Sequence, residues 1–337
     1  MIMNWLTWQD FISSRPAFRR KQLEKAVFQQ LISDWSEATT LPASDREWLS
    51  LNCPLTIKAE FLGQEDKGAE KARLELSDGY LVETVLMRHA DGRRTVCLSS
   101  QVGCPLGCAF CATGQLGFKR NLVAYEIIEQ ILLWQRRLAL VGEKVDNVVF
   151  MGMGEPLLNL EEVLKAIEIL HNPEALAIGW RHIAISTVGL VPEIKQLMNF
   201  GQQIKLAWSL HAADNRLRDR LMPINKRYNL EQVKRAMLEY AQTTNRRIMV
   251  EYLLLDGVND SADQAEKLTE FLDDFPKNLI VINILTYNPS DGNFRASRLE
   301  NRRDFVNILK RRGYGVTERL SLGQEVVGAC GQLGRKN

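Results

Sequence analysis

Cys97-Leu-Ser-Ser-Gln-Val-Gly-Cys104-Pro-Leu-Gly-Cys108-Ala-Phe-Cys111 is the stretch that decides how this chain is organised. It contains four of the six cysteines, and Cys104, Cys108 and Cys111 follow the spacing C-x3-C-x2-C. Cysteine thiolates are the usual ligands of iron–sulfur clusters, and a cubane cluster normally takes four of them. Three ligands without an evident fourth predict a cluster with one open iron, which can bind a substrate.

A buried helix face, a zinc site and a disulfide framework each fit this spacing less well. Cysteines at i, i+4 and i+7 could share one helix face, but Gly103, Pro105 and Gly107 disfavour a helix here. A structural zinc site needs four ligands, commonly in paired Cys or Cys/His sets, and His89 and His182 form no such motif with these cysteines. A disulfide framework is typical of small secreted chains rather than one of 337 residues.

The overall composition is that of an ordinary soluble protein, with 45% hydrophobic and 25% charged residues and a net charge of +2. No basic leader region opens the chain and no apolar run reaches the length of a membrane span, so we expect a cytosolic protein. From 295 to 337, ten Lys/Arg stand against four Asp/Glu. This local excess can bind phosphates or can be a solvated helix face.

The first 52 residues are predicted to be a helical accessory domain. Apolar residues at helical spacing mark residues 19–32, and Ser44 is expected to cap a further short helix. Basic residues gather on this part of the chain and hint at RNA contact; they are Arg15, Arg19, Arg20, Lys21 and Lys25.

Strand patterns follow, and then strands alternate with helices. Residues 53–94 contain three strand patterns with hairpin turns between them, which predicts a small β extension. Residues 95–337 contain six strand patterns, each followed by a helix, and the first strand leads into the cysteine stretch. This alternation predicts an α/β fold with a partial (β/α)6 barrel. Six units fall short of a closed eight-unit barrel and leave an open side for a large substrate.

Polar residues and glycines lie where several of these strands are expected to end. In a parallel barrel the chemistry takes place at these ends. Each motif alone could equally be a turn, but together they predict one rim; they are Gly152–Pro156, Ser186-Thr187, Ser209-Leu210-His211 and Tyr287-Asn288-Pro289. The glycines of the first motif do not form a dinucleotide-binding loop, because Leu157 occupies the position of the third glycine.

Four further residues complete the candidate set. Cys53 is expected to be a buried apolar residue, whereas Cys330 lies among glycines in a polar tail, which favours a reactive thiol. Cys97 is a surplus thiol beside the cluster motif. Glu83 falls within a strand of alternating apolar residues, and the alternation does not decide whether it faces solvent or the interior.

These residues together resemble the radical S-adenosylmethionine enzymes. The phrases SSQVGC, CATGQLGFKRNL, MGMGEPLLN, STVGLVP, SLHAADNRLRDRLMPIN, DGVND and ACGQL resemble the RlmN and Cfr branch of 23S rRNA adenosine methyltransferases, and the similarity extends from Arg19 to Leu333. One departure lies at the reactive cysteine: family members commonly carry Ala-Ala-Cys, where this chain has Gly328-Ala329-Cys330. The thiol itself is in place.

The resemblance implies a role for each candidate residue. Cys104, Cys108 and Cys111 would ligate one 4Fe–4S cluster whose open iron chelates S-adenosylmethionine. Cys330 would be the methylated cysteine, Cys97 its resolving partner, and Glu83 an acid–base carboxylate. The residues that would contact S-adenosylmethionine are Gly154, Glu155, Ser186, Ser209, Leu210, His211 and Asn288.

The resemblance also implies the reaction and the partners. The enzyme would use two molecules of S-adenosylmethionine per turnover in a methyl-cysteine ping-pong mechanism to methylate carbon 2 of adenosine 2503 in 23S rRNA. Adenosine 37 of tRNA is an open second substrate. Cfr-like methylation of carbon 8 of the same rRNA adenosine is the alternative, because the stretch from Pro16 to Leu49 resembles both members of the branch. An external reductant such as flavodoxin and a monomeric state are expected.

The domains would then be an RNA-contacting helical domain (1–52), a β extension (53–94) and a radical barrel with a C-terminal catalytic-cysteine loop (95–337). Two other classes stay open. A radical enzyme of another type, such as an activase or a tRNA-thiolating enzyme, would not need Cys97 and Cys330 as a pair. An iron–sulfur protein that only binds or senses RNA would not cleave the cofactor.

Overall fold

One ten-stranded sheet runs through most of the chain in the computed structural model, which describes residues 5–63, 68–289, 294–319, 323 and 327–334. The strand order is β1-β2-β3-β4-β7-β8-β9-β10-β11-β12. The strands from β4 onward pair in parallel, whereas β1 to β4 pair antiparallel. The predicted α/β fold with a partial barrel is therefore confirmed, and the predicted β extension continues the barrel's own sheet.

The parallel strands follow the predicted alternation closely. Six of them were predicted, and a seventh, β12 (Val316–Arg319), pairs in parallel with β11. The six are β4 (Arg94–Cys97), β7 (Asn147–Phe150), β8 (Ile183–Thr187), β9 (Lys205–Ser209), β10 (Ile248–Leu254) and β11 (Ile280–Thr286). The antiparallel strands are β1 (Ala59–Leu62), β2 (Ala69–Glu75) and β3 (Leu81–Arg88).

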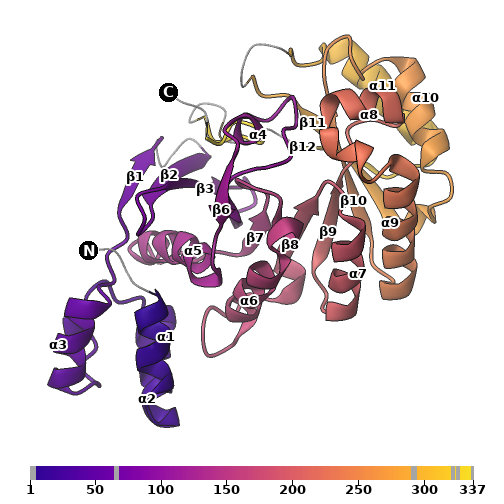
Figure 1. Cartoon of the computed structure of the whole chain (residues 1–337). Coiled ribbons are helices and arrows are strands. Elements are labelled where there is room, and N and C mark those ends of the chain that lie inside the picture. The colour runs from indigo at the N-terminus through magenta and orange to yellow at the C-terminus, as the bar shows by residue number, and fades with distance from the viewer. Residues whose placement is uncertain (1–4, 64–67, 290–293, 320–322, 324–326, 335–337) are drawn as a thin grey trace.

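Amphipathic helices between these strands cover the sheet, as Figure 1 shows. Their apolar faces are buried against it. They are α5 (Ala124–Ala139), α6 (Leu160–His171), α7 (Val191–Phe200), α9 (Leu230–Thr244), α10 (Ala262–Phe271) and α11 (Leu299–Arg311), with the short α4 (Ala112–Gln115) and α8 (Asn215–Leu221) at strand ends. No helix in the described ranges is both long and apolar enough to cross a membrane.

The N-terminal helices form a group at one side of the sheet (Figure 1). They are α1 (Trp5–Ser13), α2 (Ala17–Glu24), a π-helix (Lys25–Gln29), a 3-10 turn (Trp35–Glu37) and α3 (Ala43–Asn52). The prediction that Ser44 caps the last helix is wrong: α3 begins at Ala43, after Pro42, and no side chain caps it. Stacked rings of Trp8 and Trp35, 5.5 Å apart, join the first helix to the 3-10 turn.

A two-stranded ribbon brackets the cysteine loop. Strand β5 (Gln101–Gly103) pairs antiparallel with β6 (Phe118–Asn121), and the residues between them include the cysteine motif and α4. Gly103 has φ +75°, and a Cβ there would lie 1.9 Å from the carbonyl oxygen of Gly117. Only glycine permits this close approach, so the ribbon fixes both ends of the loop. Within the loop, as predicted, no helix spans Cys104 to Cys111.

Candidate functional site

Three thiols of the cysteine motif line one cavity at the carboxyl ends of the parallel strands. Burial raises the pKa of Cys104 to about 12, and it raises the pKa values of Cys108 and Cys111 as well. The metal-free thiols are therefore protonated at neutral pH. Cluster assembly has to displace these protons, because the metal ligand is the thiolate.

Polar groups at the ends of β7, β8 and β9 form another part of the cavity lining. The hydroxyl oxygens of Ser186 and Ser209 lie 3.1 Å apart, within hydrogen-bond distance. Glu155 is buried, and its carboxylate accepts hydrogen bonds from the amides of Leu157 (3.1 Å) and Val188 (3.0 Å). Burial raises the pKa of Glu155 to about 7. The carboxylate thus ties the loop after β7 to the loop after β8.

His211 lies on the same wall in an unusual backbone conformation, with φ +58°. Burial lowers the pKa of its imidazole to about 3, so the ring is neutral at physiological pH. The ring nitrogen Nδ1 accepts a hydrogen bond from the Leu253 amide at 3.1 Å, which leaves the proton on Nε2. Phe110 meets the ring edge-on, with centroids 5.0 Å apart. The site therefore contains a neutral imidazole of fixed tautomer.

Two predicted cofactor-contacting residues, Leu210 and Asn288, are not among the described residues that line the cavity; Leu210 contacts its surroundings through its backbone and Asn288 through its side chain. The Leu210 amide donates to the Glu251 carbonyl (3.1 Å). The Asn288 side-chain amide donates to the Cys330 carbonyl at 3.2 Å. Asn288 thus joins the end of β11 to the C-terminal segment.

Cys330 reaches this cavity from the other end of the chain. It lines the same wall as the cluster cysteines and is solvent-exposed. Cys97, the predicted resolving partner, is buried at the end of β4 and lies outside the described lining of the cavity. No disulfide joins any two of the six cysteines, all of which are described. Cys53 is buried, as predicted.

Glu83 faces the interior, which settles the choice that its sequence pattern left open. It lies on β3, and both carboxylate oxygens accept hydrogen bonds: Oε1 from Lys71 at 3.2 Å and from Arg73 at 3.3 Å, and Oε2 from the Gly334 amide at 2.8 Å. Glu83 is not among the described residues of the cavity wall. Its carboxylate therefore contacts β2 on one side and the C-terminal segment on the other.

Arg218 on α8 is a residue of the site that the sequence motifs did not reveal. Its buried guanidinium donates to the carbonyls of Val188 (2.7 Å), Ser209 (3.3 Å) and Leu210 (3.1 Å). Burial lowers the pKa of Arg218 to about 10, so it stays charged. The signal that could have revealed it is an arginine between Leu217 and Leu221 on the buried helix face.

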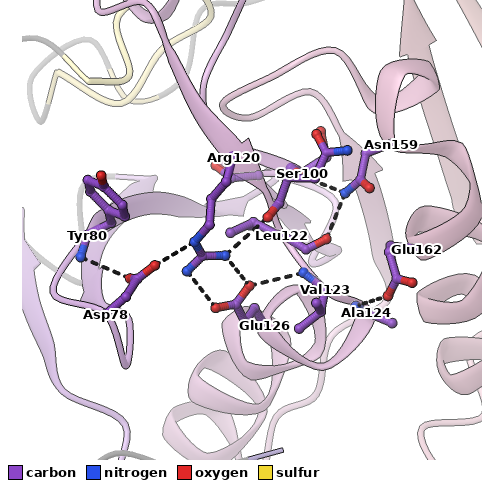
Figure 2. A network of polar contacts seen from close by, with 12 residues as sticks. Asp78, Tyr80, Ser100, Arg120, Leu122, Val123, Ala124, Glu126, Asn159 and Glu162 are labelled. Atoms are coloured by element: carbon purple, nitrogen blue, oxygen red, sulfur yellow. Dashed lines mark hydrogen bonds and ion pairs between the residues drawn. The ribbon is translucent and has the colours of Figure 1, made fainter. Parts of the chain in front are cut away.

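A second polar network supports the ribbon that follows the cysteine loop, as Figure 2 shows. Arg120 on β6 donates to Asp78 at 2.5 Å and to both carboxylate oxygens of Glu126 at 2.8 and 2.9 Å. Glu126 also accepts from the Val123 amide (3.0 Å) at the start of α5. Asn159 donates to the carbonyls on either side of the loop, at Ser100 (2.9 Å) and Leu122 (2.8 Å). The cysteine loop is therefore held on a rigid base.

The donor set fits an iron–sulfur cluster and S-adenosylmethionine. Thiolates are the soft ligands that such clusters take, and the facing hydroxyl, carboxylate and imidazole groups can bind a polar amino-acid moiety. Among the described residues, no three His, Cys, Asp or Glu side chains converge on the position of a single metal ion. A four-iron cluster places each thiolate on a different iron and needs no such convergence.

Comparisons with known proteins point to the same chemistry. The Radical SAM superfamily matches residues 98–272. Two probable dual-specificity RNA methyltransferases named RlmN are similar over 94% of this chain: one from Dictyoglomus thermophilum (40% identity, 90% of its length) and one from Symbiobacterium thermophilum (42%, 85%). The crystal structure of a radical SAM methyltransferase from Sphaerobacter thermophilus, 39% identical, superposes with a TM-score of 0.92 over 98% of this chain and 97% of its own.

Proposed function

Because the chain belongs to the RlmN group of radical SAM RNA methyltransferases, we propose that it methylates carbon 2 of adenosine 2503 in 23S rRNA through Cys330. One observation supports this most directly. Cys330 comes from the far end of the chain and lines the same cavity as Cys104, Cys108 and Cys111. A radical enzyme that did not use a methylated cysteine would not need this thiol there.

Ring carbons of adenine require this kind of machinery. Carbon 2 is an electron-poor aromatic carbon that cannot attack a sulfonium methyl group as a nitrogen would. When bound, the cluster and S-adenosylmethionine supply methyl groups and radical chemistry, with two molecules of S-adenosylmethionine consumed per turnover. The protein contributes binding, orientation and the exclusion of side reactions.

The residues of the cavity wall divide this work. Cys104, Cys108 and Cys111 would hold the cluster. Gly154 lies on the cavity lining, where its backbone would contact S-adenosylmethionine, and its lack of a side chain lets the loop after β7 pack against Gln101. Ser186, Ser209 and Glu155, with the backbone at Leu210 and the side chains of His211 and Asn288, orient S-adenosylmethionine. The neutral His211 ring donates only through Nε2, which restricts how a bound group can be oriented.

Two thiols carry out the group transfer. Cys330 as the thiolate takes a methyl group and later bears the adenine through that carbon. Cys97 as the thiolate then attacks the Cys330 sulfur, and a disulfide forms as the bond between that sulfur and the product carbon breaks; the carbon keeps the electron pair and takes up a proton, which completes the methyl group. This exchange needs both thiols within bonding distance. The acid–base role predicted for Glu83 stays a prediction, and its contacts support a positioning role.

RNA is the substrate of the proposed reaction. The target adenine has to be unstacked to enter the cavity, and tRNA stays open as a second substrate. We infer that the basic residues of the N-terminal helices and of the C-terminal part contact RNA phosphates. An external one-electron donor such as flavodoxin would reduce the cluster.

Labelling tests the proposal. The anaerobically reconstituted protein is incubated with methyl-labelled S-adenosylmethionine, and the peptide containing Cys330 is analysed by mass spectrometry. We expect label on Cys330 and none in the Cys330→Ser protein. Label on other residues only would exclude the methyl-cysteine mechanism.

The resolving role of Cys97 has its own test. With RNA present, Cys97→Ala should accumulate a covalent RNA–protein adduct through Cys330, seen as a shifted band on a denaturing gel. Release of fully methylated RNA by Cys97→Ala would refute the role. Cys53→Ala is the matched control, because Cys53 is buried in the N-terminal part of the chain and should leave turnover unchanged.

A further inference from the structure

A buried pair of opposite charges, Lys71 and Glu83, lies beside the C-terminal segment. Their side chains are 0% and 4% exposed, and Lys71 Nζ lies 3.2 Å from Glu83 Oε1. Both come from neighbouring antiparallel strands, β2 and β3. Removing two charges from water is costly, so such pairs need further hydrogen bonds to satisfy the remaining donors and acceptors. The C-terminal segment supplies them.

Each member of the pair binds one end of the segment that carries Cys330. Lys71 Nζ donates to the Val327 carbonyl at 3.2 Å, three residues before the thiol. Glu83 Oε2 accepts from the Gly334 amide at 2.8 Å, four residues after it. Cys330 therefore lies on a loop whose two ends are fixed on one ion pair.

Two hydrogen bonds from helix α4 to this loop fix the position of the loop at the cavity. The Ala112 amide donates to the Gly331 carbonyl at 2.8 Å, and the Thr113 hydroxyl donates to the Leu333 carbonyl at 2.7 Å. Both donors belong to α4, directly after the last cluster cysteine. The segment is thus held between the cluster loop and the β2–β3 ion pair, with Cys330 on the cavity wall.

We propose that Lys71 and Glu83 are positioning residues that clamp the two ends of the Cys330 segment (327–334) and so hold the thiol at the cavity. The inference that these residues hold the segment in place depends on the contacts alone. The inference that this affects methyl transfer to Cys330 rests on the proposed function. Neither residue lies on the described cavity wall, so each acts through the segment.

Arg73 provides a matched control. It lies two residues from Lys71 on β2 and donates to the same oxygen of Glu83, at 3.3 Å, but its second carboxylate partner is Glu60 on β1. Arg73→Met removes a cationic donor from Glu83 and leaves both contacts to the segment. Lys71→Met removes a donor from Glu83 and also the hydrogen bond to the Val327 carbonyl. The double variant Lys71→Met/Glu83→Leu removes both contacts to the segment and leaves neither member of the pair as a buried unpaired charge, so it separates loss of the clamp from loss of folding.

Hydrogen–deuterium exchange of the full chain tests the clamp without any substrate. In Lys71→Met and in the double variant, amides of 327–334 should exchange about tenfold faster than in the wild type, since a hydrogen bond to a charged group is lost. Arg73→Met should exchange within about twofold of the wild type. Equal exchange rates in all four proteins, or equal acceleration by Arg73→Met, would overturn the proposal.

Methylation of Cys330 separates this inference from the proposed function. With methyl-labelled S-adenosylmethionine, Lys71→Met should lower the rate of label transfer to Cys330 about tenfold at unchanged KM for S-adenosylmethionine. A change in KM with an unchanged rate would contradict a positioning role. If the wild type takes up no label on Cys330 while the exchange results are as expected, the proposed function fails and the clamp stands.

Discussion

Two glycines at the end of β7 decide how closely the strand ends can approach one another. A Cβ on Gly152 would lie 2.7 Å from backbone atoms of Leu98 and Ser99, and a Cβ on Gly154 would lie 2.6 Å from the Gln101 side chain at φ +98°. Contacts shorter than 3.0 Å require a neighbour to move. These glycines therefore bring the loop after β7 against the residues that lead into the cysteine loop.

Gly152→Ala tests this packing. The added methyl group meets backbone atoms, which cannot move aside as a side chain can, so we expect the free energy of unfolding to fall by about 2–3 kcal/mol. Gly315→Ala is the control, because its Cβ would have only one neighbour, at 3.8 Å. Urea denaturation measures both. Equal free energies of unfolding for the two variants would show that the close packing of Gly152 against Leu98 and Ser99 does not contribute to stability.

His211 predicts a pH dependence of stability. Its folded pKa is lowered to about 3, below the value of about 6.5 in an unfolded chain. Between these values the unfolded chain binds a proton that the folded protein does not, so stability falls as pH decreases through this range. From pH 7 to 5, the metal-free wild type should lose about 2 kcal/mol more unfolding free energy than His211→Gln. His182→Gln, at an exposed position, should behave as the wild type.

At the residue scale, the sequence predicted the residues that line the cavity better than the residues that support it. The spacing of Cys104, Cys108 and Cys111 is a local pattern, and such patterns can be read directly. The contacts of Lys71 with Val327 and of Glu83 with Gly334 join positions more than 250 residues apart. No periodicity signals such a pairing, so only the folded chain shows it.

One side chain of helix α8, that of Arg218, connects the helix to backbone carbonyls at the barrel rim. Arg218 is fully buried and binds carbonyls at the ends of β8 and β9, and it also donates to Asn225 in the 3-10 turn after α8 (3.0 Å). Carbonyls beyond a strand's last pair have no partner in the sheet. The guanidinium therefore supplies donors where the sheet cannot.

Arg218→Met should remove this support. Several buried carbonyls would lose their donor, and we expect the unfolding free energy to fall by about 3 kcal/mol. Arg216→Met is the matched control, because Arg216 lies on the same helix and is exposed. Chemical denaturation measures the unfolding free energy of both variants. Equal losses of unfolding free energy would contradict the supporting role assigned to Arg218.

Elements with an extended apolar pattern were predictable, and those without one were not. Amphipathic helices such as α5 and buried strands such as β10 repeat their apolar pattern often enough to be recognised. Strands β5, β6 and β12 have only three or four residues each and were not predicted; β4 and β7 are equally short, but their apolar patterns continue for one or two residues beyond the strand. The predicted single helix over 19–32 is divided because the chain changes to a π-helix at Lys25.

Over the whole molecule, one continuous ten-stranded sheet connects the strands that lead into the cysteine loop with the strands whose ends line the cavity. Its antiparallel part carries Glu83 on β3, Cys97 lies on β4 where the antiparallel and parallel parts meet, and the ends of the parallel strands line the cavity. Arg19, Arg20 and Lys21 lie on α2, and Arg302, Arg303, Lys310 and Arg311 lie on α11, and none of them lines the cavity; Arg335 and Lys336 of the predicted basic regions fall outside the residues that the structure describes. We therefore expect RNA affinity and Cys330 chemistry to be separable by mutation.

Charge removal on the N-terminal helices tests this separation. Arg20, Lys21 and Lys25 are exposed, and their joint change to Gln should weaken RNA binding and reduce the slope of log affinity against log salt concentration by about 2. Methyl labelling of Cys330 should stay unchanged. Joint replacement by Gln of the exposed Lys165, Lys195 and Lys205 is the control. Equal affinity and salt slope in the two triple variants would exclude the N-terminal helices as a phosphate contact.

The identity of the modified nucleoside decides whether this chain is a carbon 2 methyltransferase. A 23S rRNA fragment is incubated with the reconstituted, reduced protein and methyl-labelled S-adenosylmethionine, then digested and analysed by mass spectrometry against authentic standards. We expect labelled 2-methyladenosine that is absent with Cys330→Ser. Labelled 8-methyladenosine would contradict the carbon 2 assignment, and unmodified adenosine would contradict the methyltransferase itself.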